Sequence, residues 1–296
     1  MRTWKSLTVL ASVAALGIAI SGLTTAASAS TPASKLHPAV IYKSLVSSPG
    51  NLPSVGAEAY AFNEFGNQVH FAGSNRHLTH AVVTMSTWGC QTGTWNAGTC
   101  LTTPGATFTE PITLNVYRPS TDGINPGVLL TSVTQTFTIP YRPSASPRCT
   151  GTSAGQWYDF GHKTCFNGKA VNLYFTIGGT VPSTVVYGIA YNTTHYGYHP
   201  IGEAAACFTS SGGCGYDSLN IGLSQDPTNV RVGHDTTPGT VWQNSTVASE
   251  YCDAGAAGTG TFRLDSPTAS CWGVNAPYTT APYYVPAVQF TAVGAR

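Results

Sequence analysis

Residues 171–177 read Val-Asn-Leu-Tyr-Phe-Thr-Ile, an alternation of apolar and polar side chains that is typical of a half-buried β-strand. The same period of two is found in residues 112–117 (Ile-Thr-Leu-Asn-Val-Tyr) and 219–223 (Leu-Asn-Ile-Gly-Leu). Because successive side chains of a strand point to opposite faces, each segment can bury one face. No stretch beyond the N-terminal leader has a sustained helical period, so the sequence predicts an all-β protein.

Eight further segments have a strand-like composition, and turn residues separate them, among 32 Gly and 19 Pro spread along the chain. They are residues 55–62, 68–72, 78–87, 128–139, 184–191, 240–244, 260–264 and 287–293. Connections of unequal length and the lack of an internal repeat favour a two-sheet antiparallel, jelly-roll-like sandwich with long loops over a propeller. A second domain beginning near Tyr196 is the alternative, but its few strand candidates fall short of the roughly seven of a typical sandwich.

The N-terminus has the features of a secretory signal peptide. Arg2 and Lys5 precede an apolar run over residues 7–23, and the small-residue site Ala-Ser-Ala follows at 27–29. A retained transmembrane anchor would need about 20 strongly apolar residues, whereas serine, threonine and glycine interrupt this run. We therefore expect residues 1–29 to be removed and the mature protein to be secreted, extracellular and not inserted into a membrane.

We expect residues 30–44 of the mature chain to be flexible and residues 45–296 to form a single β-sandwich domain. Loss of the leader removes two of the thirteen Lys and Arg residues and leaves eleven, against twelve Asp and Glu. Nucleic acids and anionic membranes bind clustered Lys and Arg, and the sequence contains no such cluster. Charged residues make up only 8% of the chain, so a surface rich in hydroxyl and amide groups would suit neutral ligands.

Eight cysteines follow the leader, which is typical of a chain that folds in an oxidising, extracellular environment. They form four neighbouring pairs in the sequence: Cys90 with Cys100, Cys149 with Cys165, Cys207 with Cys214, and Cys252 with Cys271. Spacing alone does not determine the connectivity, but sequential pairing is favoured because each loop is short and rich in Gly, Ser and Thr. Zinc binding, the alternative role, requires closer cysteine pairs than these.

Two motifs suggest catalysis or metal binding, and neither has the context that its chemistry requires. Residues 151–155 (Gly-Thr-Ser-Ala-Gly) match the nucleophile elbow of α/β-hydrolases, but Ser153 would have to lie between a buried strand and a helix, and here it lies inside a short cysteine-bounded loop. His195 and His199 are four residues apart, but a glycine and a proline beside them disfavour the helix that would bring them together. We therefore assign no catalytic residue, no metal and no cofactor.

Aromatic residues in predicted loops are the best candidates for ligand binding. Trp95 lies at the middle of the loop between Cys90 and Cys100, next to Asn96. An exposed ring beside amides and hydroxyls can stack on the apolar face of a sugar. Weaker members of the same set are Tyr196 and Tyr198, followed by Tyr278, Tyr283 and Tyr284. The alternative is that Trp95 folds back and covers a sheet edge or its own disulfide.

Several segments resemble a group of uncharacterised exported bacterial proteins, some of which carry C-terminal sorting or anchoring tails. The resemblance is carried by residues 51–69 (Asn-Leu-Pro-Ser-Val-Gly-Ala-Glu-Ala-Tyr-Ala-Phe-Asn-Glu-Phe-Gly-Asn-Gln-Val), 86–88 (Ser-Thr-Trp), 165–168 (Cys-Phe-Asn-Gly) and 186–192. It implies a secreted or cell-surface β-sandwich. No active site of the group can be carried over, because these segments hold no catalytic motif.

Two classes of function remain open from the sequence. The favoured one is a secreted, non-catalytic β-sandwich protein that binds a cell-surface partner or a neutral glycan, such as a neutral polysaccharide or a cell-surface glycan. The alternative is a secreted hydrolase that acts on polysaccharide. A hydrolase would need two carboxylates about 5–10 Å apart, and the sequence cannot show which of its carboxylates meet. The candidates are Glu58, Glu64, Glu110, Asp159, Glu203, Asp217, Glu250 and Asp265.

Overall fold

The computed structural model describes residues 37–57, 62–95, 97–191, 219–245, 261–265 and 283–294. Leu36–Arg296 forms one compact unit. The predicted signal peptide, residues 1–29, lies outside the described residues. Within the described ranges, no helix has both the length and the apolar character needed to span a membrane.

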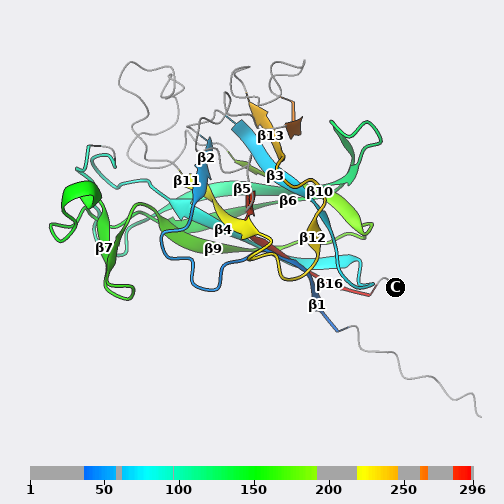
Figure 1. Cartoon of the computed structure of the whole chain (residues 1–296), viewed down its shortest axis with the longest axis horizontal. Coiled ribbons are helices and arrows are strands. Elements are labelled where there is room, and N and C mark those ends of the chain that lie inside the picture. The colour runs from blue at the N-terminus through cyan, green and yellow to red at the C-terminus, as the bar shows by residue number, and fades with distance from the viewer. Residues whose placement is uncertain are drawn as a thin grey trace, which may run out of the picture. The chain divides into compact units, whose positions relative to one another are not determined.

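Two large antiparallel sheets make up the fold (Figure 1). The first has the strand order β1-β16-β4-β11-β15, with β2 paired to β11 and β9 paired to β4. Its strands are β1 (Ala39–Lys43), β2 (Ser54–Gly56), β4 (His77–Thr87), β9 (Lys169–Thr176), β11 (Leu219–Asp226), β15 (Tyr283–Pro286) and β16 (Val288–Val293). Strands that are distant in the sequence, such as β4 and β16, are therefore neighbours in this sheet.

The second sheet has the order β14-β13-β3-β10-β5-β6, with β12 paired to β3. Its strands are β3 (Phe62–His70), β5 (Thr107–Pro119), β6 (Pro126–Pro140), β10 (Thr184–Tyr191), β12 (His234–Asp235), β13 (Val241–Ser245) and β14 (Arg263–Asp265). A separate two-stranded hairpin is formed by β7 (Trp157–Asp159) and β8 (Thr164–Phe166).

Aromatic contacts join the inner faces of the two sheets. The rings of Phe137 on β6 and Phe175 on β9 are 4.7 Å apart, and Phe290 on β16 lies 5.4 Å from Tyr187 on β10. Both sheets contribute to one cluster of buried apolar side chains. The predicted all-β sandwich is therefore confirmed, while its jelly-roll connectivity stays a prediction.

The apolar residues that alternate along the predicted strand at residues 112–117 are also the residues that are buried in the structure. Along β5, Ile112, Leu114 and Val116 are fully buried, while the residues between them are partly exposed. This is the behaviour expected of a strand with one face on the core. The cross-strand partners of β5 continue this inner face, since Leu114 pairs with Ile189 of β10.

The N-terminal boundary of the domain lies earlier than predicted. Residues 39–43 were expected to be flexible, but they form β1, which pairs with β16 along its whole length. Ile41 and Tyr42 are consecutive and yet both buried, because the register shifts between Val40 and Tyr42. This shift breaks the period of two that would have identified the strand.

One side chain of β6 forms hydrogen bonds with the backbone of β9. Strand β6 ends the second sheet, and β9 pairs only with β4 among the described strands. The amide of Gln135 on β6 donates to the Tyr174 carbonyl at 3.3 Å and accepts the Thr176 N–H at 2.7 Å. Gln135 therefore pairs with the backbone of β9 as a neighbouring strand would.

Candidate functional site

Two of the four predicted disulfides are present in the described residues, and each closes a loop. Cys90 bonds Cys100 and Cys149 bonds Cys165, with Cα–Cα distances of 5.3 Å and 5.8 Å. These bonds indicate that the protein folds in an oxidising compartment, such as the periplasm or the extracellular space. The other two predicted pairs, Cys207 with Cys214 and Cys252 with Cys271, lie outside the described residues.

The loop from Cys149 to Cys165 carries the β7–β8 hairpin, which lies at one end of the two sheets (Figure 1). Phe160 follows β7 at the tip of this hairpin, and 72% of it is exposed. The guanidinium of Arg148 lies 5.6 Å from the ring centres of both Tyr158 and Phe160. A cation at this distance attracts the faces of the two rings and so stabilises their orientation.

The buried side chain of Arg142 holds the two ends of the β7–β8 hairpin in place. Arg142 donates from Nε to the carbonyl of Asn167 and from Nη2 to the carbonyl of Gly155, the latter at 2.6 Å. Burial lowers the pKa of Arg142 to about 10, so this guanidinium remains charged at neutral pH. The indole N–H of Trp157 adds a bond of 3.0 Å to the carbonyl of Gly168.

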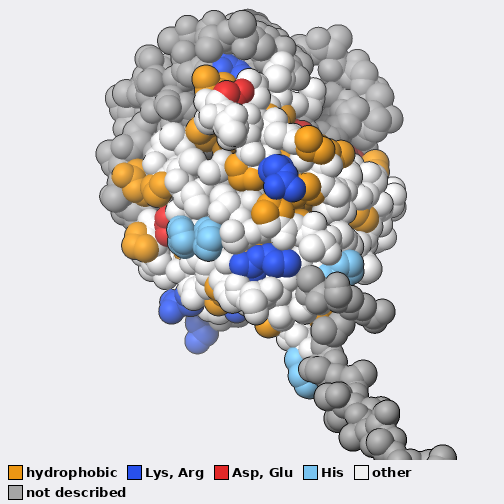
Figure 2. Space-filling model, turned by 90° about the vertical axis from the view of Figure 1, so that its right-hand side faces the viewer, with side chains coloured by type: hydrophobic (Ala, Val, Ile, Leu, Met, Phe, Trp, Pro, Cys, Tyr) orange, Lys and Arg blue, Asp and Glu red, His pale blue; other side chains and the backbone are white. Residues whose placement is uncertain are grey.

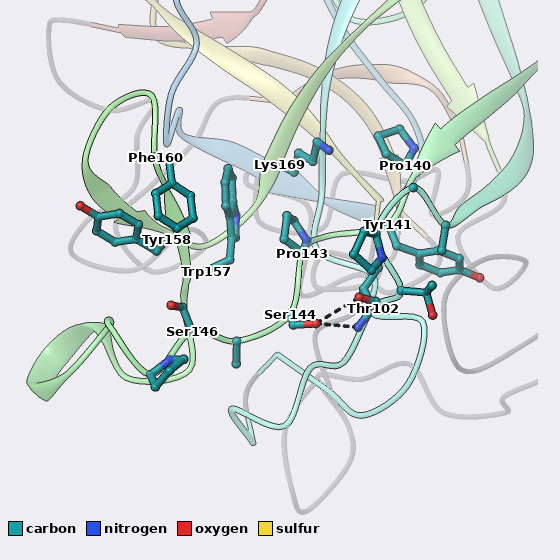
Figure 3. A pocket seen from close by; sticks show the side chains of 16 residues that line it. Thr102, Pro140, Tyr141, Pro143, Ser144, Ser146, Trp157, Tyr158, Phe160 and Lys169 are labelled. Atoms are coloured by element: carbon teal, nitrogen blue, oxygen red, sulfur yellow. Dashed lines mark hydrogen bonds between the residues drawn. The ribbon is translucent and has the colours of Figure 1, made fainter.

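A surface cavity of about 520 Å³ opens beside the hairpin (Figure 3). Its volume falls within the roughly 300–1,000 Å³ of small-molecule sites. Aromatic side chains form one wall, with the rings of Tyr158 and Phe160 5.1 Å apart and perpendicular to each other. The aromatic lining residues are Tyr141, Trp157, Tyr158 and Phe160.

The remaining lining combines rigid apolar groups with hydroxyls. Four prolines contribute apolar surface: Pro104, Pro140, Pro143 and Pro147. Ser144 Oγ accepts the Thr102 N–H at 2.9 Å and donates to the Thr102 carbonyl at 3.2 Å, as the dashed lines of Figure 3 show. Lys169 is the single charged residue among the described residues that line this cavity. An apolar wall with a few hydroxyl groups can bind a neutral, amphipathic ligand.

Figure 2 shows the end of the sandwich opposite the β7–β8 hairpin. Charged side chains on that face are few and are scattered among uncharged groups. Neither a basic stripe nor a large acidic patch is present on this face, so the view offers no field that would attract a strongly charged polymer.

Trp95, the aromatic residue first expected to bind a ligand, is half-buried. Its ring lies 4.7 Å from that of Trp88, edge to face, and its indole N–H donates to Oδ1 of Asn167 at 3.3 Å. These contacts show that Trp95 folds back onto Trp88, which follows β4, and onto Asn167, which follows β8. Its contact with a ligand stays a prediction. Asn96, Tyr196 and Tyr198, the other predicted ligand-binding residues, lie outside the described residues.

The substitution Trp95→Ala should lower the free energy of unfolding by about 1–2 kcal/mol, because it removes a half-buried ring and leaves the Asn167 amide without this donor. Urea unfolding of the mature chain would measure the change, and glycan affinity should be measured on the same samples. A variant that keeps full stability but loses affinity would show that Trp95 contacts the ligand instead of packing on Trp88 and Asn167.

Of the weaker tyrosine candidates, Tyr283 and Tyr284 do not line the cavity. Tyr283 and Tyr284 lie on β15, paired with Asp226 and Gln225, and the hydroxyl of Tyr284 accepts the Gln225 amide at 3.2 Å. Both tyrosines are half-buried. Tyr278 lies outside the described residues.

Ser153 lies inside a short disulfide-closed loop, as the sequence predicted. Residues 151–153 form a single turn of 3-10 helix within the disulfide-closed loop. Neither a buried strand before the serine nor an α-helix after it is present in this described segment, so the geometry of a nucleophile elbow is missing.

Two of the carboxylates that could form a glycosidase pair, Glu64 and Glu110, do not meet, whereas Glu58, Glu203, Asp217 and Glu250 lie outside the described residues. Glu64 on β3 is 7% exposed and accepts hydrogen bonds from the Asn115 amide and the Tyr117 hydroxyl, both at 3.0 Å. Burial raises the pKa of Glu64. Glu110 is also buried, but it points to the opposite face of β5 from Asn115 and Tyr117. Glu64 and Glu110 therefore cannot act on one substrate.

Three of the best placed aromatic residues were not identified from the sequence. Trp157, Tyr158 and Phe160 occur within four consecutive positions of a cysteine-bounded loop. This is the same signal that singled out Trp95, and a count of aromatic residues in each loop would have found it. The cavity itself could not be predicted, because its other wall comes from residues 102–106 and 140–147.

The chain was compared with protein-family models, curated proteins and solved structures, and none of them matches it.

Proposed function

We propose that this protein is exported from the cell and binds a neutral glycan in the aromatic cavity beside the β7–β8 hairpin. The observation that carries the proposal is the pair of rings formed by exposed Phe160 and half-buried Tyr158, on a hairpin that a disulfide and Arg142 hold in place. A sugar presents an apolar C–H face and a polar rim to the same surface. The rings can stack on that face while the nearby hydroxyls bind the rim.

Rigidity favours the proposal as well. An exposed ring that is already fixed loses little conformational freedom when a ligand binds, so more of the contact energy contributes to affinity. Disulfide closure, the Arg142 bonds and the proline-rich wall restrict this site in the free protein. The near-neutral charge of the mature chain agrees with an uncharged polymer as ligand.

The substitution Phe160→Ala should weaken glycan binding by about 5–150-fold, which corresponds to the roughly 1–3 kcal/mol of an aromatic anchor. The mature chain would be tested for pull-down on cellulose, chitin, xylan and mannan, and for reducing sugar released from each. Affinity for the polymer that binds would then be compared between variants by isothermal titration.

Tyr174→Ala is the matched control, because Tyr174 is 67% exposed and lies on β9 outside the cavity. Its affinity should equal that of the unsubstituted protein. Equal losses in both variants would mean that binding does not depend on this cavity. Release of reducing sugar would instead favour the polysaccharide hydrolase.

A further inference from the structure

A second, smaller cavity of about 200 Å³ lies against the same hairpin. Trp157 and Lys169 line both cavities, and the smaller one adds Asp159 and His162 from the hairpin and Gly50 from the loop after β1. The two cavities therefore share part of their wall. A ligand held in the larger one would place its substituents close to the residues of the smaller one.

His162 and Asp159, which line the smaller cavity, form a connected chain of hydrogen bonds with Ser48, the residue that precedes Pro49 and Gly50 of the same lining. Ser48 Oγ lies 3.1 Å from His162 Nε2, and His162 Nδ1 lies 2.9 Å from Asp159 Oδ2. The other oxygen of Asp159 accepts the Gly161 N–H at 2.7 Å, which fixes the carboxylate. The His162 ring also lies 5.4 Å from the ring of Phe166, which is buried.

The order of these bonds determines which nitrogen of His162 carries the proton. A carboxylate only accepts, so Nδ1 donates to Asp159 and Nε2 is left with a lone pair directed at the Ser48 hydroxyl. The bond from His162 lowers the pKa of Asp159, so this carboxylate is ionised at neutral pH. Nucleophile, base and orienting carboxylate are thus all within hydrogen-bond distance, as acyl transfer requires.

We propose that Ser48, His162 and Asp159 form a catalytic triad that hydrolyses small acyl esters, and that its substrates are acyl groups carried by the glycan. The substrate class rests on the proposed glycan binding, whereas the triad itself does not depend on it. Ser48 and His162 are exposed, so a substituent on a long polymer can reach them. The cavity has room for a short acyl chain.

The reaction is a hydrolysis that requires water as its only co-substrate. Ser48 Oγ attacks the ester carbonyl carbon while His162 Nε2 takes the hydroxyl proton, and the carbonyl electrons move to oxygen. Collapse of this intermediate breaks the bond to the sugar oxygen, which leaves as an alcohol with the proton from His162. Water, activated by the same nitrogen, then releases the carboxylic acid and restores Ser48.

The test treats the full mature chain with a fluorophosphonate probe and maps the labelled peptide. Hydrolysis of p-nitrophenyl acetate is measured in parallel. We expect the label on Ser48, and Ser48→Ala should lower kcat by about 1,000-fold or more. Ser153→Ala is the matched control, since that serine satisfies the sequence motif but not the geometry, and it should retain full activity. An absent label, a label elsewhere, or full activity in Ser48→Ala would overturn the proposal.

Asp159 is a positioning residue, and its variants separate that role from a structural one. Asp159→Asn should lower kcat with little change in KM, and Asp159→Glu should restore part of the loss. Equal activities of the three forms would overturn the role of Asp159 in the triad.

A pair of polymers separates this inference from the proposed function. Acetylated xylan and its deacetylated form are tested for binding and for released acetate. Binding of either polymer without a Ser48 label would sustain the glycan site and overturn the triad. Ser48 labelling and ester cleavage without binding would sustain the triad and overturn glycan binding, and with it the substrate class.

Discussion

The variant Asp235→Asn should be more stable than the unsubstituted protein at pH 7.5, by up to about 3 kcal/mol, and by less than about 1 kcal/mol at pH 4. Asp235 on β12 is 7% exposed, and burial raises its pKa from 3.8 to about 6. A shift of one pKa unit corresponds to about 1.4 kcal/mol. The folded protein therefore favours the protonated carboxyl, which asparagine resembles.

The sign of this effect follows from proton linkage. Because the pKa of Asp235 is higher in the folded state, its contribution to stability is fully present below the pKa of the unfolded chain. That contribution is lost as the pH rises from about 4 to 6. One favourable contact survives in the variant, since an asparagine oxygen can still accept the Thr237 N–H that bonds Asp235 at 2.8 Å.

Urea unfolding of both proteins at several pH values would measure the difference. Asp122→Asn is the control, because Asp122 is exposed and hydrogen bonds from Asn125 lower its pKa, so this variant should show no gain at neutral pH. A stability difference for Asp235→Asn that stays constant from pH 4 to 7.5 would show that Asp235 is not buried as a carboxyl with a raised pKa.

Gly66→Ala should lower the free energy of unfolding by about 3 kcal/mol or more. Gly66 on β3 pairs with Gly188 on β10, and a Cβ added at Gly66 would lie 1.7 Å from the Tyr187 carbonyl oxygen. That oxygen belongs to the backbone of a central strand, so it cannot rotate out of the way. Relief of the clash would require the two strands to separate.

Gly178→Ala provides the comparison for this glycine, since no heavy atom lies within 4 Å of an added Cβ. It should change the stability by no more than about 0.5 kcal/mol. The midpoints and slopes of urea unfolding curves would be compared between the two variants. Similar values for both would mean that β3 and β10 are not as closely packed at Gly66 as described.

Sequence periodicity predicted the strands whose inner faces are continuously apolar. Residues 112–117 and 219–223 lie wholly in β5 and β11, and residues 171–177 lie in β9 except for Ile177, which follows its last residue. The prediction for β3 began only at residue 68, although the strand starts at Phe62. Its first half contains Glu64, a polar residue that can be buried only because partners from β5 satisfy its carboxylate.

The candidate sites were harder to predict than the strands, because they depend on contacts between residues that are distant in the sequence. Aromatic residues in a cysteine-bounded loop could be recognised from sequence, and so could the two disulfides that the structure describes. The triad could not, because Ser48 and His162 are 114 positions apart and no spacing rule relates them. Only the pairing of the strands brings the loop after β1 next to the β7–β8 hairpin.

The contact between Gln135 and β9 has a consequence for self-association. An edge strand with free N–H and C=O groups is a template on which a strand of another molecule can be added, and long sheets can grow in this way. On β9 the Tyr174 carbonyl and the Thr176 N–H are already bonded by the side chain of Gln135 of the same molecule. Two backbone groups of this edge are therefore unavailable to a strand of another molecule, and Lys169 adds a charge at the start of β9.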